Sequence, residues 1–231
     1  MLKIKNLIVK QGNFELKANF SVSNGDLVAI VGPSGGGKST LLSAIAGFLN
    51  IESGTIHLNN VQISGLEPRD VPCTLLFQDN NLFPNLCVFD NVALGISPNL
   101  KLLTVEQEQV QEVLERVELS NYRNAMPRTL SGGQISRVAL ARALIRDKPL
   151  LMLDEAFGAL GPAQRKEMLS YVQQIVVGSK SILLMITHDP LDAKHLANQV
   201  IFVEGGVVHN PVKVESFFKK PSTLVRKYLG I

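Results

Sequence analysis

The sequence feature that most constrains the fold is a glycine-rich loop at residues 32–39, Gly-Pro-Ser-Gly-Gly-Gly-Lys-Ser. A continuous apolar run at residues 27–31 precedes it, and apolar residues follow at helical spacing up to Gly47. Strand, glycine loop and helix in this order form a phosphate cradle, because the glycine backbone turns its N–H groups inward and the helix adds its positive end. The alternative is a glycine-rich surface turn, which would not need this strand and helix context.

Two side chains of the loop have chemical roles of their own. Lys38 is placed to reach the β- and γ-phosphates of a nucleotide, and the hydroxyl of Ser39 suits Mg²⁺, which prefers hard oxygen ligands. The predicted nucleotide-binding residues of this segment are Gly32, Pro33, Ser34, Gly35, Gly36, Gly37, Lys38, Ser39 and Thr40.

Length and composition narrow the class of protein. The 231 residues, 45% of them hydrophobic, can bury the core of one large α/β domain, and no apolar run is long enough for a membrane span. With 23 Lys and Arg against 20 Asp and Glu, the chain lacks the charge excess of a dedicated nucleic-acid binder, so we expect no nucleic-acid partner. The start lacks the apolar core of a signal peptide, and Cys73 and Cys87 have no nearby cysteine partner, which favours the cytoplasm.

The remaining pattern predicts strands around this loop and a helical insertion. Residues 79–98 are rich in Asn, Pro and Gly, and residues 105–117 carry an apolar helical repeat, which indicates a smaller helical lobe at residues 79–147. The basic tail from Pro211 onward is expected to be a solvated helix face, with anionic lipid as the alternative partner. Predicted hairpins span residues 2–9 with 14–22, 53–58 with 61–63, and 199–204 with 207–210, and predicted buried strands span residues 74–77, 150–153 and 181–186.

A second informative stretch is Leu-Ser-Gly-Gly-Gln at residues 130–134. Ser131 and Gln134 have the spacing of a capping box ahead of a helix, and a well-capped helix is a sufficient structural explanation for them. The two glycines of the first turn, Gly132 and Gly133, each cost about 1 kcal/mol of helix propensity. A bare helix N-terminus suits a second phosphate contact, so both interpretations stay open at this point.

Polar side chains follow three predicted strands. Asp154 and Glu155 follow the strand at residues 150–153, His188 comes shortly after residues 181–186, and Gln78 follows residues 74–77. Ligands bind at the carboxyl ends of parallel strands, so we predict that Asp154 holds Mg²⁺ and that Glu155 polarises the attacking water. The alternatives are solvated carboxylates and a structural histidine.

Taken in order, the phosphate loop, Gln78, residues 130–134, Asp154-Glu155 and His188 resemble the ATP-binding subunit of an ABC transporter over essentially the whole chain. The resemblance implies an α/β fold with a P-loop NTPase core, a mostly parallel sheet, an N-terminal antiparallel β layer and the inserted helical lobe, all in one domain at residues 1–231. It implies ATP and Mg²⁺ as cofactors, with Ser39, Gln78 and Asp154 near the metal, and Glu155 and His188 as catalytic residues.

The same resemblance implies the partners. Two copies stack head to tail, so that Ser131, Gly132, Gly133 and Gln134 of one copy contact the ATP on the other. The helical lobe docks on transmembrane permease subunits at the cytoplasmic face of the inner membrane, and an extracytoplasmic solute-binding protein takes part indirectly. Residues 76–84, residues 98–102 and the Leu-Gly-Ile end further resemble ATPase subunits of bacterial thiamine importers, which implies thiamine or its phosphates as cargo.

Three places depart from the family pattern, of which the Ile-Ser-Arg at residues 135–137 changes only the flank of the helix start. Position 11 is Gln where the family usually has an aromatic residue that stacks on adenine, which predicts weaker and less base-selective nucleotide binding. Position 161 is Gly where an aspartate is usual, which predicts slower or less coordinated hydrolysis. The alternatives are an importer ATPase for another small solute, a soluble ABC ATPase without a membrane partner, and a P-loop kinase, although a kinase has no need of residues 130–134.

Overall fold

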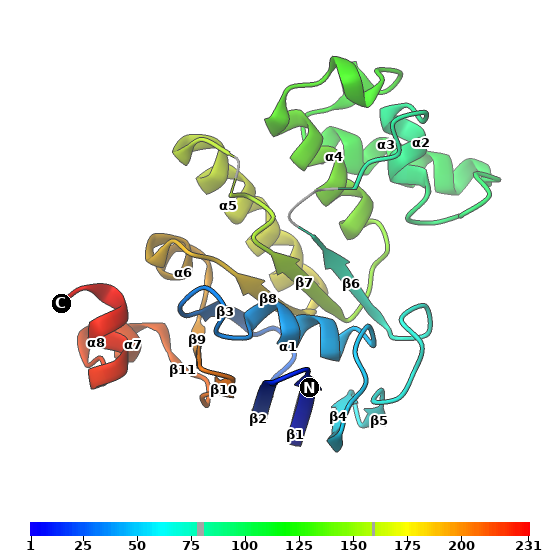
Figure 1. Ribbon diagram of the computed structural model, residues 1–231. Helices are drawn as coiled ribbons and strands as arrows, with labels where there is room; N and C mark the ends of the chain where they lie inside the picture. The colour runs from blue at the N-terminus through cyan, green and yellow to red at the C-terminus, as the bar shows by residue number, and fades with distance from the viewer. Residues whose placement is uncertain (78–80, 159) are drawn as a thin grey trace. The chain divides into compact units, whose positions relative to one another are not determined.

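The computed structural model describes residues 1–77, 81–158 and 160–231 (Figure 1). Their contacts divide the chain into two compact units. Unit 1 comprises residues 1–73, 149–155 and 169–231, and unit 2 comprises residues 74–148 and 156–168. The predicted lobe at residues 79–147 falls within the first segment of unit 2, and the assignment of the whole chain to one domain stays a prediction.

The centre of unit 1 is a parallel ladder of buried strands. Its order is β9-β3-β8-β7, and all neighbours in it run parallel. Every residue of β3 and β8 is buried, as expected for parallel strands covered on both faces. This confirms the mostly parallel sheet around the phosphate loop. The strands are β3 (Leu27–Val31), β7 (Leu150–Asp154), β8 (Ile182–Ile186) and β9 (Gln199–Glu204).

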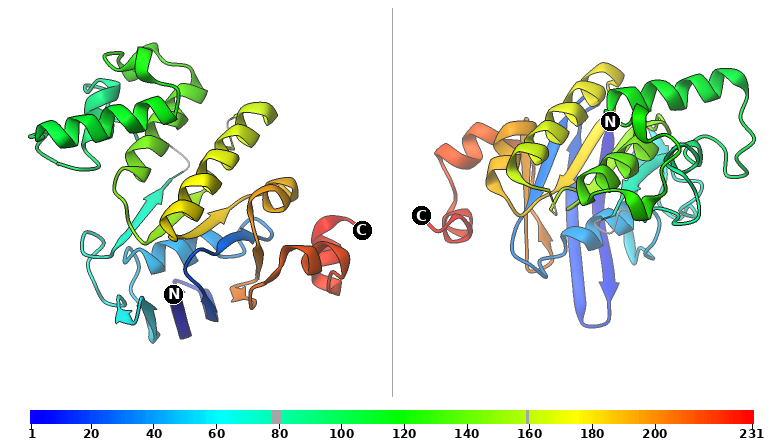
Figure 2. Two further views of the ribbon diagram at one scale, coloured as in Figure 1. Left: turned by 180° about the vertical axis from the view of Figure 1, so that it is seen from behind. Right: turned by 90° about the horizontal axis from the view of Figure 1, so that it is seen from above.

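Antiparallel strands form the other part of the sheet. The order β5-β4-β1-β2 contains only antiparallel neighbours, which confirms the N-terminal β layer (Figure 2, right). Alternating burial along β2 puts one face on the core, as its sequence pattern predicts. Asn59 and Asn60 both take positive φ, 49° and 67°, at the predicted hairpin turn. The strands are β1 (Leu2–Gln11), β2 (Phe14–Val22), β4 (Ser53–Leu58) and β5 (Val61–Gln62).

A short strand joins the two parts of the sheet. β10 (Val207–Val208) pairs parallel with β2 and antiparallel with β9, so the N-terminal hairpin lies next to the parallel ladder. This junction brings the turn between β9 and β10 against the phosphate loop, where the Gly206 N–H donates to the Gly36 carbonyl at 3.0 Å.

Helices complete unit 1. The C-terminal helices α7 and α8 follow β11 (Figure 1). Phe217 and Val225 from these helices are buried in a core cluster with residues of β3 and β9. The tail is therefore more than a solvated helix face, although its lysines and arginines are exposed. The elements are α1 (Lys38–Ile45), α6 (Pro190–Leu196), β11 (Val212–Lys213), α7 (Val214–Lys219) and α8 (Thr223–Leu229).

Unit 2 is mainly helical. Asn91 is fully buried and holds the loop before α2, because its amide donates to the carbonyls of Phe83, Leu86 and Cys87. β6 (Cys73–Leu76) and α5 (Pro162–Ser179) each cross the boundary between the units. The helices of unit 2 are α2 (Val88–Ala93), α3 (Thr104–Arg116) and α4 (Gly132–Leu144), with 3-10 turns at Ser120–Tyr122 and Pro127–Thr129. Within the described ranges, no helix has both the length and the apolar character needed to cross a membrane.

Candidate phosphate-binding site

The glycine loop connects β3 to α1, as the sequence predicts, and its backbone explains the glycines. Gly32 has φ of +148°, and a Cβ there would lie 2.0 Å from the carbonyl oxygen of Val203. Gly37 caps α1 in the left-handed region, and a Cβ there would meet the side chains of Leu16 and Phe14 at 2.7 and 2.9 Å. L-residues avoid both conformations, and at Gly32 the obstructing atom is backbone, so glycine is required there; at Gly37 the obstructing atoms are the ends of side chains.

Lys38 lies inside this loop. Its side chain is 5% exposed, and its Nζ donates to the carbonyls of Gly32 and Pro33 at 2.9 Å each. Burial lowers the pKa of Lys38, while the carboxylates of Glu155 and Asp154 act to raise it. The loop therefore holds a cation close to its backbone, where an incoming phosphate oxygen could replace a carbonyl as its partner.

The carboxylate edge of the site comes from the end of β7. Ser39 Oγ donates to Asp154 Oδ1 at 3.2 Å, so the first turn of α1 and the end of β7 meet as predicted. Burial raises the pKa of Asp154, and the hydrogen bond from Ser39 acts in the opposite direction. A hydroxyl and a partly buried carboxylate together form a donor pair suited to a hard divalent cation.

Glu155 and His188 form a pair next to this edge. Glu155 Oε1 and His188 Nε2 are 2.5 Å apart, and the Glu155 N–H donates to the carbonyl of Ile186 at 3.2 Å. Glu155 has φ of +51°, a conformation that non-glycine residues adopt rarely. The sequence indicated each residue separately, and the structure shows the pair.

The side of the loop that faces the β1–β2 turn contains two contacts that the sequence did not predict. Thr40 Oγ1 donates to Gln11 Oε1 at 3.4 Å, and the ring of Phe14 lies against Gly37. Both residues come from the ends of the β1–β2 hairpin. The turn at residues 11–13 indicated a hairpin, but its distance from the phosphate loop depends on the β2–β10 pairing, which local sequence patterns do not encode.

Residues 130–134 form the predicted capped helix start in unit 2. The Ser131 hydroxyl accepts from the Gln134 N–H at 3.3 Å, and Gln134 Oε1 accepts from the Ser131 N–H at 2.9 Å. Ser131 and Gly132 are exposed, and a Cβ on Gly132 would meet no atom within 4 Å. The cap is therefore complete without requiring glycine at position 132.

The remaining predicted positions are Gln78 and Gly161. Gln78 lies outside the described residues, so its predicted contacts with the metal and the γ-phosphate stay a prediction. Gly161 is exposed just ahead of α5, its carbonyl accepts from the Arg165 N–H at 2.9 Å, and a Cβ there would meet nothing within 4 Å.

Comparison with known families decides the classification. A family profile described as ABC transporter matches residues 16–158, which include the phosphate loop, residues 130–134 and Asp154-Glu155. The chain belongs to the ABC transporter family. As an ABC protein it resembles the thiamine import ATP-binding protein ThiQ of Cereibacter sphaeroides, with 46% identity over all of both chains, and that of Photobacterium profundum, with 47% identity over 99% of this chain and 98% of the relative.

Solved structures support the ABC fold. A dimeric bacterial ABC transporter cassette matches with a TM-score of 0.80 and 28% identity, over 93% of this chain and 99% of that chain. A dimeric post-hydrolysis cassette bound to ADP and Pi matches with a TM-score of 0.81 and 27% identity over the same shares. A nucleotide-free cassette from an ABC transporter has a TM-score of 0.87 at 22% identity, which shows the fold alone.

Proposed function

We propose that this chain is the ATP-hydrolysing subunit of an ABC importer for thiamine, with thiamine phosphates as further cargo. The observation that carries the ATPase assignment is the meeting of Lys38, Ser39, Asp154, Glu155 and His188 at the carboxyl ends of parallel strands in unit 1. The cargo assignment is supported by full-length relatives that are named thiamine import ATP-binding proteins.

ATP binds with its phosphates in the loop between β3 and α1. The loop N–H groups and the α1 N-terminus supply partial positive charge, and Lys38 supplies a full one. Loss of the carbonyl contacts of Lys38 is offset by a stronger charge-assisted contact with a phosphate oxygen. Gln11 and Phe14 flank the turn between β1 and β2. The family usually has its base-stacking aromatic residue in this hairpin.

Mg²⁺ fits the donors present. Mg²⁺ takes few protein ligands and uses phosphate oxygens and water for the rest. Ser39 and Asp154 would hold it, together with Gln78. Bound there, Mg²⁺ would neutralise phosphate charge during transfer.

Glu155 is assigned as the general base and His188 as its orienting partner and a γ-phosphate contact. The carboxylate accepts a proton from the attacking water, and the 2.5 Å contact with His188 holds it in one orientation. Asp154 is the preceding residue, but it bonds to Ser39 instead, so the adjacent acids have different roles.

The complete site needs a second copy of the chain. We assign Ser131, Gly132, Gly133 and Gln134 to the phosphate of ATP bound by the partner in a head-to-tail dimer. Exposure of Ser131 and Gly132 supports this, as does the dimeric state of two related cassettes of known structure. The lobe at residues 79–147 of the single domain docks on transmembrane permease subunits at the cytoplasmic face of the inner membrane, which receive cargo from an extracytoplasmic binding protein.

The test of the chemistry is Glu155→Gln. The amide keeps the shape of the side chain but does not accept the proton, so hydrolysis should fall by about 10²–10⁴-fold while ATP binding persists and an ATP-bound dimer accumulates. ATP turnover and size-exclusion chromatography with ATP measure the two effects. Glu67→Gln, an exposed carboxylate in unit 1, is the matched control and should match the wild type.

A separate measurement tests the cargo. The ATPase is isolated with the membrane proteins that co-purify with it, reconstituted in liposomes with the binding protein, and assayed with thiamine, thiamine monophosphate or an unrelated vitamin. Stimulation by thiamine supports the assignment. Stimulation of ATP hydrolysis by another solute alone would identify that solute as the cargo in place of thiamine. Failure to associate with any membrane protein would favour a soluble ABC ATPase.

A further inference from the structure

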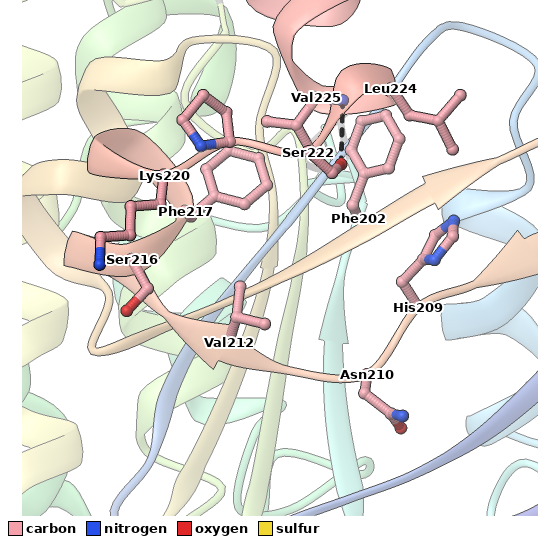
Figure 3. Close-up of a pocket in the computed structure, with 11 residues that line it drawn as sticks. Phe202, His209, Asn210, Val212, Ser216, Phe217, Lys220, Ser222, Leu224 and Val225 are labelled. Atoms are coloured by element: carbon pink, nitrogen blue, oxygen red, sulfur yellow. Dashed lines mark hydrogen bonds between the residues drawn. The ribbon is translucent and has the colours of Figure 1, made fainter.

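A pocket of about 240 Å³ lies under the C-terminal helices in unit 1 (Figure 3). It is lined by residues 202–225 of β9, β11, α7, α8 and their connections. None of its lining residues belongs to the phosphate loop or the carboxylate edge, so the proposed ATPase mechanism does not use it.

The walls of the pocket are mainly aromatic and aliphatic. The rings of Phe202 and Phe217 lie 6.4 Å apart, tilted by 46°, and the His209 ring lies 5.8 Å from Phe202. Val225 lines the pocket from α8 and Val212 from β11. Tilted rings with aliphatic neighbours favour a flat apolar group, because ring faces and edges both give attractive contacts.

The charge at the rim is positive. Lys220 lines the pocket and is exposed, and Figure 3 shows it on the side of the Phe217 ring away from His209. Its neighbour Lys219 pairs with Glu215 at 3.4 Å, but no carboxylate in the described ranges pairs with Lys220. A ligand with a negative substituent near Lys220 would gain a charge pair that the protein itself does not supply.

Phe202, in one wall of the pocket, has two neighbours that lie close to the phosphate loop. The Phe202 ring meets the Tyr228 ring edge-on at 5.6 Å. Burial raises the pKa of Tyr228, and the nearby Gly32 backbone acts against this rise. The next residue after Phe202 is Val203, whose carbonyl fills the space where a Gly32 side chain would be.

We propose that this pocket is an effector site for a small planar aromatic anion, and that binding there changes the affinity of the phosphate loop for nucleotide. A volume of about 240 Å³ suits a ligand of one or two fused rings. The ring contacts Phe202 and Phe217, its negative group pairs with Lys220, and any shift of Phe202 reaches Gly32 through Tyr228 and Val203. The site goes beyond the proposed transport function and does not depend on the cargo.

Binding is tested on the full chain with naphthalene-1-sulfonate as the probe and neutral naphthalene-1-methanol as its uncharged counterpart. Isothermal titration or ligand-detected NMR should show that the sulfonate binds more tightly. Lys220→Glu should weaken its binding by about fivefold or more, since a surface charge pair becomes a repulsion. Lys227→Glu makes the same charge change on α8, outside the pocket lining, and should have little effect.

Two pocket-filling variants keep the test independent of any one substitution. Leu224 and Val212 line the pocket from α8 and β11 and are 45% and 42% exposed, so Leu224→Trp and Val212→Trp can occupy it without replacing a core residue. Each should abolish probe binding. Unchanged probe binding in both variants, or in Lys220→Glu, would overturn the site.

The effector role is tested by the affinity for a non-hydrolysable ATP analogue with and without saturating probe. A change of about fivefold or more is expected in the wild type and none in Leu224→Trp. Probe binding with unchanged nucleotide affinity would overturn the effector role. Because nucleotide affinity without the probe is measured in the same titration, failure of the ATPase assignment is seen separately.

Discussion

Gly32→Ala is predicted to destabilise the nucleotide-free protein strongly, although it adds only one methyl group. Its Cβ would lie 2.0 Å from the carbonyl oxygen of Val203, and contacts under 3.0 Å essentially never occur. The two backbones must therefore separate by about 1 Å. β3 and β9 are paired here, with Val31 opposite Phe202, so the separation disturbs the central ladder rather than a flexible side chain.

The expected loss in the free energy of unfolding of Gly32→Ala is the sum of two effects. Overpacking of a tight site costs about 1–3 kcal/mol. A residue other than glycine at φ of +148° adds conformational strain of about 1–3 kcal/mol. We therefore expect a loss of about 4 kcal/mol in the free energy of unfolding, which for a chain of this size lowers the melting temperature by about 8–16 °C.

Gly35→Ala is the matched control. Gly35 belongs to the same loop and has φ of +75°, but a Cβ there would meet no atom within 4 Å. Only the left-handed strain remains, which costs about 1 kcal/mol. Urea and thermal unfolding without nucleotide measure both variants, so that loss of ATP binding does not enter the result. Equal midpoints for the two variants would refute the assigned contact between Gly32 and Val203.

Three further predictions concern the carboxylate edge, the helix start and the α5 entry. Burial raises the folded-state pKa of Asp154, so this residue stabilises the fold most below its unfolded-state pKa and less as the pH rises through its folded-state pKa. Asp154→Asn should therefore raise the melting temperature at pH 7 but not at pH 3. A melting temperature below that of the wild type at pH 7 would contradict this. Ser131→Asp keeps an N-cap acceptor and should preserve the free energy of unfolding within about 0.5 kcal/mol, yet its negative charge should prevent ATP-dependent dimerisation. A dimer that persists on size-exclusion chromatography would exclude the proposed contact of Ser131 with the partner's ATP phosphate. Gly161→Asp has room for its side chain and takes a favoured N-cap position ahead of α5, so stability should not fall. The ATPase rate and its cooperativity should rise. Unchanged kinetics would refute the importance of glycine at position 161, where the family usually has aspartate.

Local patterns predicted the elements well where one physical signal dominates. The apolar run at residues 27–31 became β3 without a shift in its ends, because a fully buried parallel strand has an uninterrupted apolar sequence. The capping box of Ser131 and Gln134 formed as its spacing predicts. Strand ends also indicated where Asp154 and His188 would stand, since polar residues directly after buried strands lie at the sheet edge.

Other features depend on contacts between distant segments. The contact of Glu155 with His188 joins the ends of two strands whose pairing is set by the whole ladder. The burial of Phe217 in the tail likewise follows from packing partners far along the chain, in β3 and β9. A pattern search over short windows has no information about these partners.

The phosphate loop combines features encoded by its own sequence with features that depend on distant segments of the chain. Its glycines, Lys38 and Ser39 are encoded locally, because a tight anion-binding turn limits the residue types at each position. β9 is the reason that Gly32 admits no side chain, because the Val203 carbonyl fills the space. The C-terminal helices bring Tyr228 next to Phe202 and close to Gly32. The sequence alone therefore determined the chemistry of the loop, whereas the tertiary structure decided which surfaces confine it, since close packing between distant segments arises only when the chain folds.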